Sequence, residues 1–306
     1  MSAHDESANP SLDSTLGVEL LGFGIALALY GITTAQTVAY IRRYGRPPFP
    51  PCMYMVLVLW LIDSVHITAL SYSIAFYLVR RRGNPLVFLQ PPWTLAVVII
   101  ISEINAIIVR FGYAYRIWRY SGRRPLVPCI IAISSIVILG MHVSDLSTLP
   151  IGLVFSSEEV HLRSWADGRR FQWTLYTAFS CQIAIDGLIA ISMFLVLRQF
   201  RTGLKRLDLV ITMIIMYAIN TGFLTTIGVA LSIIFFIVEP DSFIFIGIYF
   251  TLPKLYTCSF LGILNAEQRL IQHASSTGPG TTIPVLTSAW KGQKLKNSAS
   301  YQMVVS

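Results

Sequence analysis

The stretch FIFIGIYFTLPKLYTCSFLGIL, residues 243–264, is apolar for long enough to cross a membrane as a helix. About 20 consecutive apolar residues span the hydrocarbon core of a bilayer, and lipid offers no hydrogen-bond partner to an exposed backbone. The one charged residue in the stretch is Lys254, near its middle. A lysine at this depth anchors an aldehyde cofactor, pairs with a buried acid, or extends its amine to the membrane surface.

The rest of the chain contains six further runs of the same kind. Of its 306 residues, 54% are hydrophobic and only 12% are charged, whereas about 25% are charged in a typical soluble protein. The mean hydropathy is +0.64. We therefore predict an all-α polytopic membrane protein in which residues 16–265 form seven transmembrane helices. The predicted spans are 16–40, 52–78, 94–114, 126–146, 171–197, 209–237 and 243–264.

The basic residues predict the orientation of these spans. Fifteen Lys and Arg residues fall on the side of the membrane that holds the C-terminus, and six fall on the side that holds the N-terminus. Positive residues are retained in the cytoplasm, so we expect an extracellular N-terminus, residues 1–15, and a cytoplasmic tail, residues 266–306. The tail is rich in Ser, Thr and Gly and is expected to be disordered. The cluster Arg80–Arg82 is the main exception, because this orientation places it outside.

Ionisable side chains inside the spans are costly in lipid, so they usually face the bundle interior and pair with one another. On a helical projection, Lys254 shares a face with the small residues Gly247, Thr251 and Cys258, which predicts that it points inward. Its expected partner is Glu103 or Asp186. Arg110 lies close enough to the cytoplasmic end to extend out of the membrane. The predicted buried polar network consists of Asp63, His66, Glu103, Asp186, Asn220 and Lys254.

Several classes of membrane protein place polar groups in this way, and the residues argue against three of them. A retinal-type pigment would use Lys254 as a Schiff base, but microbial rhodopsins carry an acid one turn earlier, where this chain has Phe250. Familiar G-protein-coupled receptors are excluded, because the third span lacks an acid-Arg-Tyr triplet. A zinc hydrolase needs about three ligands around one ion, and only His66 and His142 lie within spans.

Two interpretations stay open beside a divergent receptor. Three mid-depth acids face one lysine, an imbalance that protonation of a carboxyl or binding of a cation would resolve. This pattern is compatible with a proton- or ion-coupled carrier, although no pair of Gly/Pro-broken helices marks a transport site. Alternatively, a Lys254 ion pair only fixes the last helix in register.

Five stretches carry a resemblance to a known family. They are LYGITTAQTVAYIRRYGRPP (29–48), VLWLIDSVHITAL (58–70), YAYRIWRYSGRRP (113–125), YAINTGFLTTIGVALSIIFF (217–236) and KLYTCSFLGILNAEQR (254–269). The chain resembles the fungal, mainly basidiomycete, seven-span integral membrane family with a C-terminal domain of unknown function. In that family the last helix reads Ser-Lys-Leu-Tyr and closes with Leu-Asn-x-Arg; here Pro253 replaces the serine and Glu267 disrupts the close. The resemblance implies a membrane protein and no established activity.

We therefore expect a receptor- or sensor-like integral membrane protein without catalysis, cofactor or metal. We expect it to be embedded in the lipid bilayer. A small-molecule ligand would enter the helix bundle itself. Cytoplasmic proteins would bind the basic loops Arg116–Arg124 and Arg198–Arg206. Nucleic acid is excluded as a partner, because the positive charge follows the topology. The alternative is a proton- or ion-coupled small-molecule carrier, followed by a membrane-embedded enzyme. Plasma membrane and internal membranes fit equally well.

Overall fold

A computed structural model describes residues 12–44, 51–80, 93–148, 172–199, 205–238 and 244–276. All regular secondary structure in these ranges is helical. Residues 1–11, 149–171, most of the basic cluster at 80–82 and the residues beyond 276 lie outside this description.

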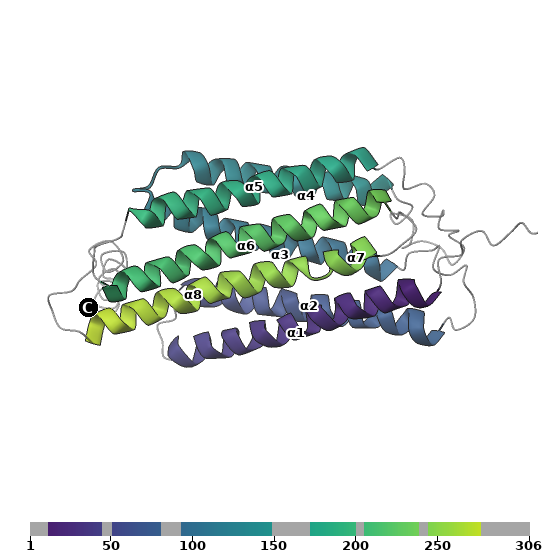
Figure 1. The fold of residues 1–306 in the computed structure, drawn as a ribbon, viewed down its shortest axis with the longest axis horizontal. Coiled ribbons are helices and arrows are strands. Elements are labelled where there is room, and N and C mark those ends of the chain that lie inside the picture. The colour runs from purple at the N-terminus through teal and green to yellow at the C-terminus, as the bar shows by residue number, and fades with distance from the viewer. Residues whose placement is uncertain are drawn as a thin grey trace, which may run out of the picture.

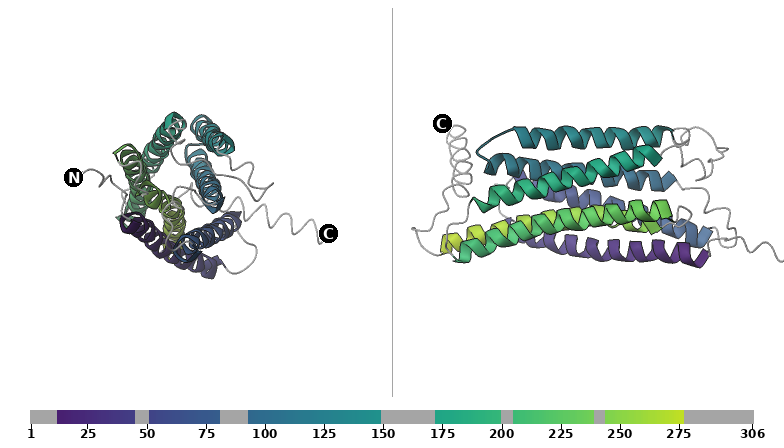
Figure 2. Two further views of the ribbon diagram at one scale, coloured as in Figure 1. Left: turned by 90° about the vertical axis from the view of Figure 1, so that its right-hand side faces the viewer. Right: turned by 45° about the horizontal axis from the view of Figure 1, so that its top comes forward.

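The helices lie side by side along one long axis (Figure 1), and an end-on view shows them gathered into one bundle (Figure 2). Consecutive helices from α1 to α6 pack against each other. The outward faces carry large apolar side chains such as Ile133, Ile191 and Met216. The elements are α1 (Leu12–Tyr44), α2 (Pro51–Arg80), α3 (Trp93–Tyr120), α4 (Leu126–Thr148), α5 (Gln172–Arg198), α6 (Lys205–Val238), α7 (Ile244–Tyr249) and α8 (Leu252–Ser276).

Six stretches of the described helices are long and apolar enough to cross a membrane. Five lie in α1, α2, α3, α5 and α6, and the sixth runs through α7 and α8 from Ile244 to Glu267. The apolar part of α4 is shorter, from Leu126 to Met141. The all-helical class and a membrane-embedded chain are therefore confirmed.

The prediction of one continuous helix over residues 243–264 is wrong, because this span is interrupted. α7 ends at Tyr249 and α8 begins at Leu252. Pro253 has no backbone N–H, so it cannot donate to the carbonyl of Tyr249. The connection is tighter than a helix, with the Thr251 N–H donating to the Ile248 carbonyl at 3.0 Å.

Helical structure also extends beyond two of the predicted segment boundaries. α8 continues to Ser276, so residues 266–276 are helical rather than the start of a disordered tail. α1 begins at Leu12, so the last residues of the predicted polar N-terminus belong to the first helix. In both cases helical hydrogen bonding extends past the apolar run, because polar residues also form helix where water or headgroups solvate their side chains.

α8 occupies a central place in the bundle, in contact with α1, α2, α3 and α6. Its side chains are buried on opposite faces: Lys254 and Leu261 are 0% exposed, and Tyr256 and Phe260 are 4% and 1% exposed. Among the described helices, α8 contributes the most residues to the main hydrophobic cluster. Polar groups on either face of α8 are therefore removed from both water and lipid.

Candidate functional site

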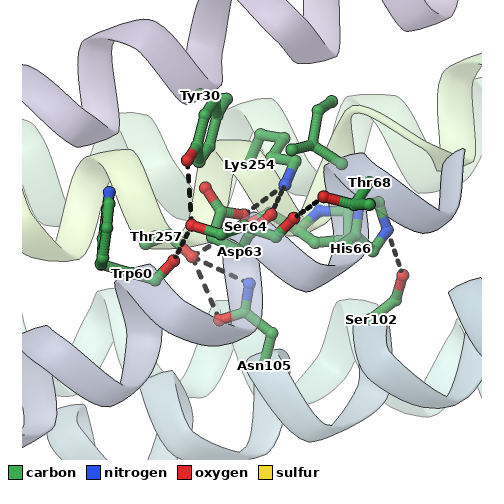
Figure 3. A network of polar contacts seen from close by, with 12 residues as sticks. Tyr30, Trp60, Asp63, Ser64, His66, Thr68, Ser102, Asn105, Lys254 and Thr257 are labelled. Carbon is green, nitrogen blue, oxygen red and sulfur yellow. Dashed lines mark hydrogen bonds and ion pairs between the residues drawn. The ribbon is translucent and has the colours of Figure 1, made fainter. Parts of the chain in front are cut away.

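The amine of Lys254 lies two residues after the start of α8 and is enclosed by the bundle. Its Nζ is 2.5 Å from Oδ1 of Asp63 on α2, and it also donates to the Asp63 backbone carbonyl at 2.9 Å. Both side chains are 0% exposed. Figure 3 shows the amine held between these two oxygens. A buried pair with this geometry satisfies each charge with the other, and loss of one partner would leave an uncompensated buried charge.

Aromatic and hydroxyl groups from α1 complete the surroundings of this pair. The ring of Tyr30 has its centroid 5.6 Å from Nζ, a distance at which the negative ring face attracts a cation. The Tyr30 hydroxyl shares a hydrogen bond of 2.9 Å with Ser64, and Trp60 donates to Thr34 at 3.2 Å. The first helix is thereby tied to the second around the ion pair.

Further polar bonds attach α3 to the same region. Nε2 of His66, one turn after Asp63, lies 2.9 Å from the hydroxyl of Ser102. The Asn105 side-chain amide donates to Thr257 at 2.9 Å. Because Thr257 is also bonded to the Pro253 carbonyl at 3.1 Å, this contact joins α3 to the first turn of α8 (Figure 3).

A second buried cluster centres on Asp186 of α5. Tyr256 of α8 and Thr225 of α6 both donate to Oδ2 of Asp186, the latter at 3.3 Å. Gln182 donates to the Tyr256 hydroxyl at 3.4 Å. Nε of Arg110 on α3 lies 3.6 Å from Oδ1 of Asp186. Four helices therefore meet at one carboxylate.

Two further contacts join α3 to the last two helices, one to α7 and one to α8. The hydroxyl of Tyr249, just before the α7–α8 interruption, donates to Oε1 of Glu103 at 3.3 Å. Further along the chain, in α8, Arg116 lies 2.6 Å from Oε2 of Glu267, and Tyr120 donates to Oε1. α3 thus contacts α7 through Glu103 and α8 through Asn105 and Arg116.

Most of the predicted polar network is buried, but it forms two separate clusters. Asp63, His66 and Lys254 lie together, whereas Asp186 belongs to the cluster of Tyr256. Two assignments were wrong. The partner of Lys254 is Asp63 rather than Glu103 or Asp186, and Asn220 is exposed on the outside of α6.

Arg110 also differs from its prediction, because it does not extend out of the membrane. Its side chain is 0% exposed and points between α3, α5 and α8. None of its three guanidinium nitrogens has a hydrogen-bond partner among the described residues. A buried donor without a partner costs about 1–3 kcal/mol, and more when it is charged. Arg110 lies near the predicted cytoplasmic end of its span, a position that favours exposure. It is buried instead because it pairs with the carboxylate of Asp186.

Sequence reasoning missed the hydroxyl and amide partners at both clusters. Tyr256 follows Lys254 by two residues and so lies on the opposite face of the helix, a position that a single-sided helix would direct to lipid. Asn105 and Thr257 are uncharged, so nothing in the sequence indicates that they take part in a buried polar contact. Among the described residues, no three His, Cys, Asp or Glu side chains are grouped to hold a metal ion.

Comparison with protein families gives one match. Residues 182–269 match a family of unknown function, DUF6534. The matched segment begins at Gln182 in α5 and ends in α8, so it contains Asp186, Thr225 and Lys254 but neither Asp63 nor Arg110. Comparisons with curated proteins and with solved structures gave no significant match.

Proposed function

We propose that this chain is a receptor- or sensor-like integral membrane protein, without catalytic activity, whose moving element is the last helix. The observation that carries the proposal is the interruption between α7 and α8, which lies directly beside the buried pair of Lys254 and Asp63. Regulatory transitions need an element with two discrete arrangements. A helix break next to a single strong contact supplies such an element.

The position of α8 supports a role in transmitting a change. It packs against α1, α2, α3 and α6 and hydrogen-bonds to Asp186 of α5. Further along α8, Glu267 is held by Arg116 of α3. A shift of its first turn, where Lys254 lies, would therefore alter contacts with five helices and reach the opposite end of the bundle.

In this proposal α4 also crosses the membrane and brings the number of spans to seven. The N-terminus is extracellular and the C-terminus is cytoplasmic. A small molecule that enters the bundle and weakens the Lys254–Asp63 contact would act as the ligand. Cytoplasmic proteins would detect the change at the basic segments Arg116–Arg124 and Arg198–Arg206. The resemblance to the fungal seven-span family supports the architecture and says nothing of the ligand.

A proton-coupled carrier is the second candidate, and one observation favours it. Among the described residues, four carboxylates are buried (Glu19, Asp63, Glu103 and Asp186), against three permanently basic side chains (Arg110, Arg116 and Lys254). An acid in excess of the buried bases is a group that can carry a proton across a membrane. A carrier also needs alternating access, for which transporters commonly use a pair of broken helices; the described part of the chain contains one, at α7–α8.

The test replaces Phe250 by 4-fluorophenylalanine and records fluorine NMR spectra in lipid nanodiscs. Phe250 lies in the interruption and is 3% exposed, so its ring reports on the local packing. A sensor is expected to give two exchanging resonances, with Asp63→Asn shifting their populations. A single resonance in both proteins would show that the pair only fixes the helix. Proton uptake into reconstituted vesicles that disappears in Asp186→Asn would favour the carrier.

A further inference from the structure

Arg110 is completely buried and forms an ion pair with Asp186, yet no described acceptor lies within hydrogen-bond distance of its nitrogens. Its three guanidinium nitrogens carry five N–H donors, and Nε, Nη1 and Nη2 all lack an acceptor in the described ranges. Oδ1 of Asp186 is 3.6 Å from Nε, which is beyond the usual length of a hydrogen bond. This geometry differs from that of Lys254, which reaches its carboxylate at 2.5 Å.

The acceptors nearby are unsatisfied as well. Oδ1 of Asp186 and Oε1 of Gln182 have no donor among the described side chains. Both residues bond through their other atoms to the hydroxyl of Tyr256, and the Tyr256 ring centroid is 5.8 Å from Cζ of Arg110. Unsatisfied donors and acceptors therefore surround the same tyrosine.

The charges at this place restrict what can bind there. An anion would be repelled by the carboxylate of Asp186. It would also lie near Glu103, which is two turns from Arg110 on the same face of α3. A cation would meet the guanidinium. The group that satisfies both sets of atoms is uncharged and both donates and accepts hydrogen bonds. A water molecule about 2.8 Å from each of two atoms that are 3.6 Å apart can bridge them from the side.

We propose that Arg110, Asp186 and Gln182 form a buried binding site for ordered water between α3, α5 and α8. Buried water typically makes about three hydrogen bonds to groups that the protein leaves unsatisfied. A ligand that displaces this water must reproduce its bonds to keep affinity, so it would present a hydroxyl or amide group. This statement of ligand class rests on the proposed receptor role, whereas the water site does not.

The test is hydroxyl-radical labelling of the full-length protein in nanodiscs, read by mass spectrometry with rapid mixing into ¹⁸O water. Radicals form at bound water, so Tyr256 is expected to gain oxygen several-fold faster than Phe250, after correction for intrinsic reactivity. The two rings are equally buried, at 4% and 3% exposure, and Phe250 lies in an apolar cluster. Equal labelling of the two rings in the wild type would overturn the proposal.

Variants then assign the water to its ligands. Arg110→Met combined with Asp186→Leu removes donors and acceptor together and is expected to lower Tyr256 labelling to the level of Phe250. Gln182→Leu keeps both charges and should lower it in part; it replaces the double variant if that protein fails to fold. Arg198→Met, at the exposed end of α5, is the matched control and should leave labelling unchanged. Unchanged labelling in the Gln182 variant and the double variant would also overturn the site, whatever the fluorine spectra show.

Discussion

At the scale of single residues, the ion pair of Lys254 and Asp63 couples α8 to α2. Because both side chains are 0% exposed, Lys254→Met should leave a buried carboxylate without its partner and destabilise the protein by about 3–5 kcal/mol. The double variant Lys254→Met/Asp63→Val removes both charges and should recover most of that loss. The measurement is the folded fraction during titration with a denaturing detergent. If the loss of stability in the double variant equals the sum of the losses in the two single variants, the two residues are not coupled.

Two asparagines provide a second residue-scale prediction. Asn105 is completely buried and bonded to Thr257 at 2.9 and 3.1 Å, while Asn220 is exposed on α6. Hydrogen bonds between transmembrane helices contribute about 0.6 kcal/mol on average and up to about 1.7. Asn105→Leu should therefore destabilise by about 1–2 kcal/mol, whereas Asn220→Leu should be neutral or stabilising in the same detergent titration. A larger loss of stability in Asn220→Leu than in Asn105→Leu would instead indicate that Asn220 belongs to the polar core.

The burial of Lys254 could be predicted from sequence, but its partner could not. Gly247 and Cys258 share its helical face, and this local periodicity identifies the inward side. Asp63, Glu103 and Asp186 all lie at similar depth in their spans, so the choice among them depends on the rotation and offset of neighbouring helices. Those quantities arise from packing between helices and leave no pattern along one chain. The same reason explains why Asn220, which is polar and near mid-span, was wrongly placed inside.

At the scale of elements, two helices approach each other closely enough to require glycine. A Cβ on Gly22 of α1 would lie 2.7 Å from the Cα of Gly247 in α7, while a Cβ on Gly24 would have no neighbour within 4 Å. Gly22→Ala must therefore shift backbone against backbone and should destabilise by about 1–3 kcal/mol.

Gly24→Ala is the matched control for this prediction, because it changes the same helix two residues away. It should leave stability unchanged or raise it slightly, since alanine has the higher helix propensity. Thermal unfolding of the purified variants compares the two. Equal effects would mean that α1 and α7 do not approach at Gly22.

The elements themselves were largely predictable, because each long apolar run needs internal hydrogen bonding in lipid. The interruption at Phe250 and Thr251 was not. Pro253 indicated a missing hydrogen bond at Tyr249, yet proline in a membrane helix often produces only a kink. The outcome depends on whether neighbouring groups stabilise the open turn, and here the Tyr249 hydroxyl is bonded to Glu103 at 3.3 Å. That contact joins residues far apart in the sequence.

At the scale of the whole molecule, the buried polar groups of α8 are divided between two sets of neighbours. Lys254 connects it to α2, whereas Tyr256 connects it to Asp186 of α5. Because these residues point to opposite faces, a rotation of α8 that lengthens one contact also disturbs the other. The two clusters are therefore expected to respond together, although no side chain belongs to both.

The orientation of the bundle is the remaining property of the whole molecule that a direct experiment decides. In the predicted seven-span topology, fifteen basic residues lie on the side of the C-terminus and six on the side of the N-terminus, and such an asymmetry normally keeps the richer side cytoplasmic. A glycosylation tag added before Met1 should be modified in cells, and the same tag after Ser306 should not. An even number of spans would place both termini on one side, so a tag modified at both ends, or at neither, would contradict seven spans. Modification only at the C-terminal tag would keep seven spans and reverse their direction, which would place Arg80–Arg82 in the cytoplasm.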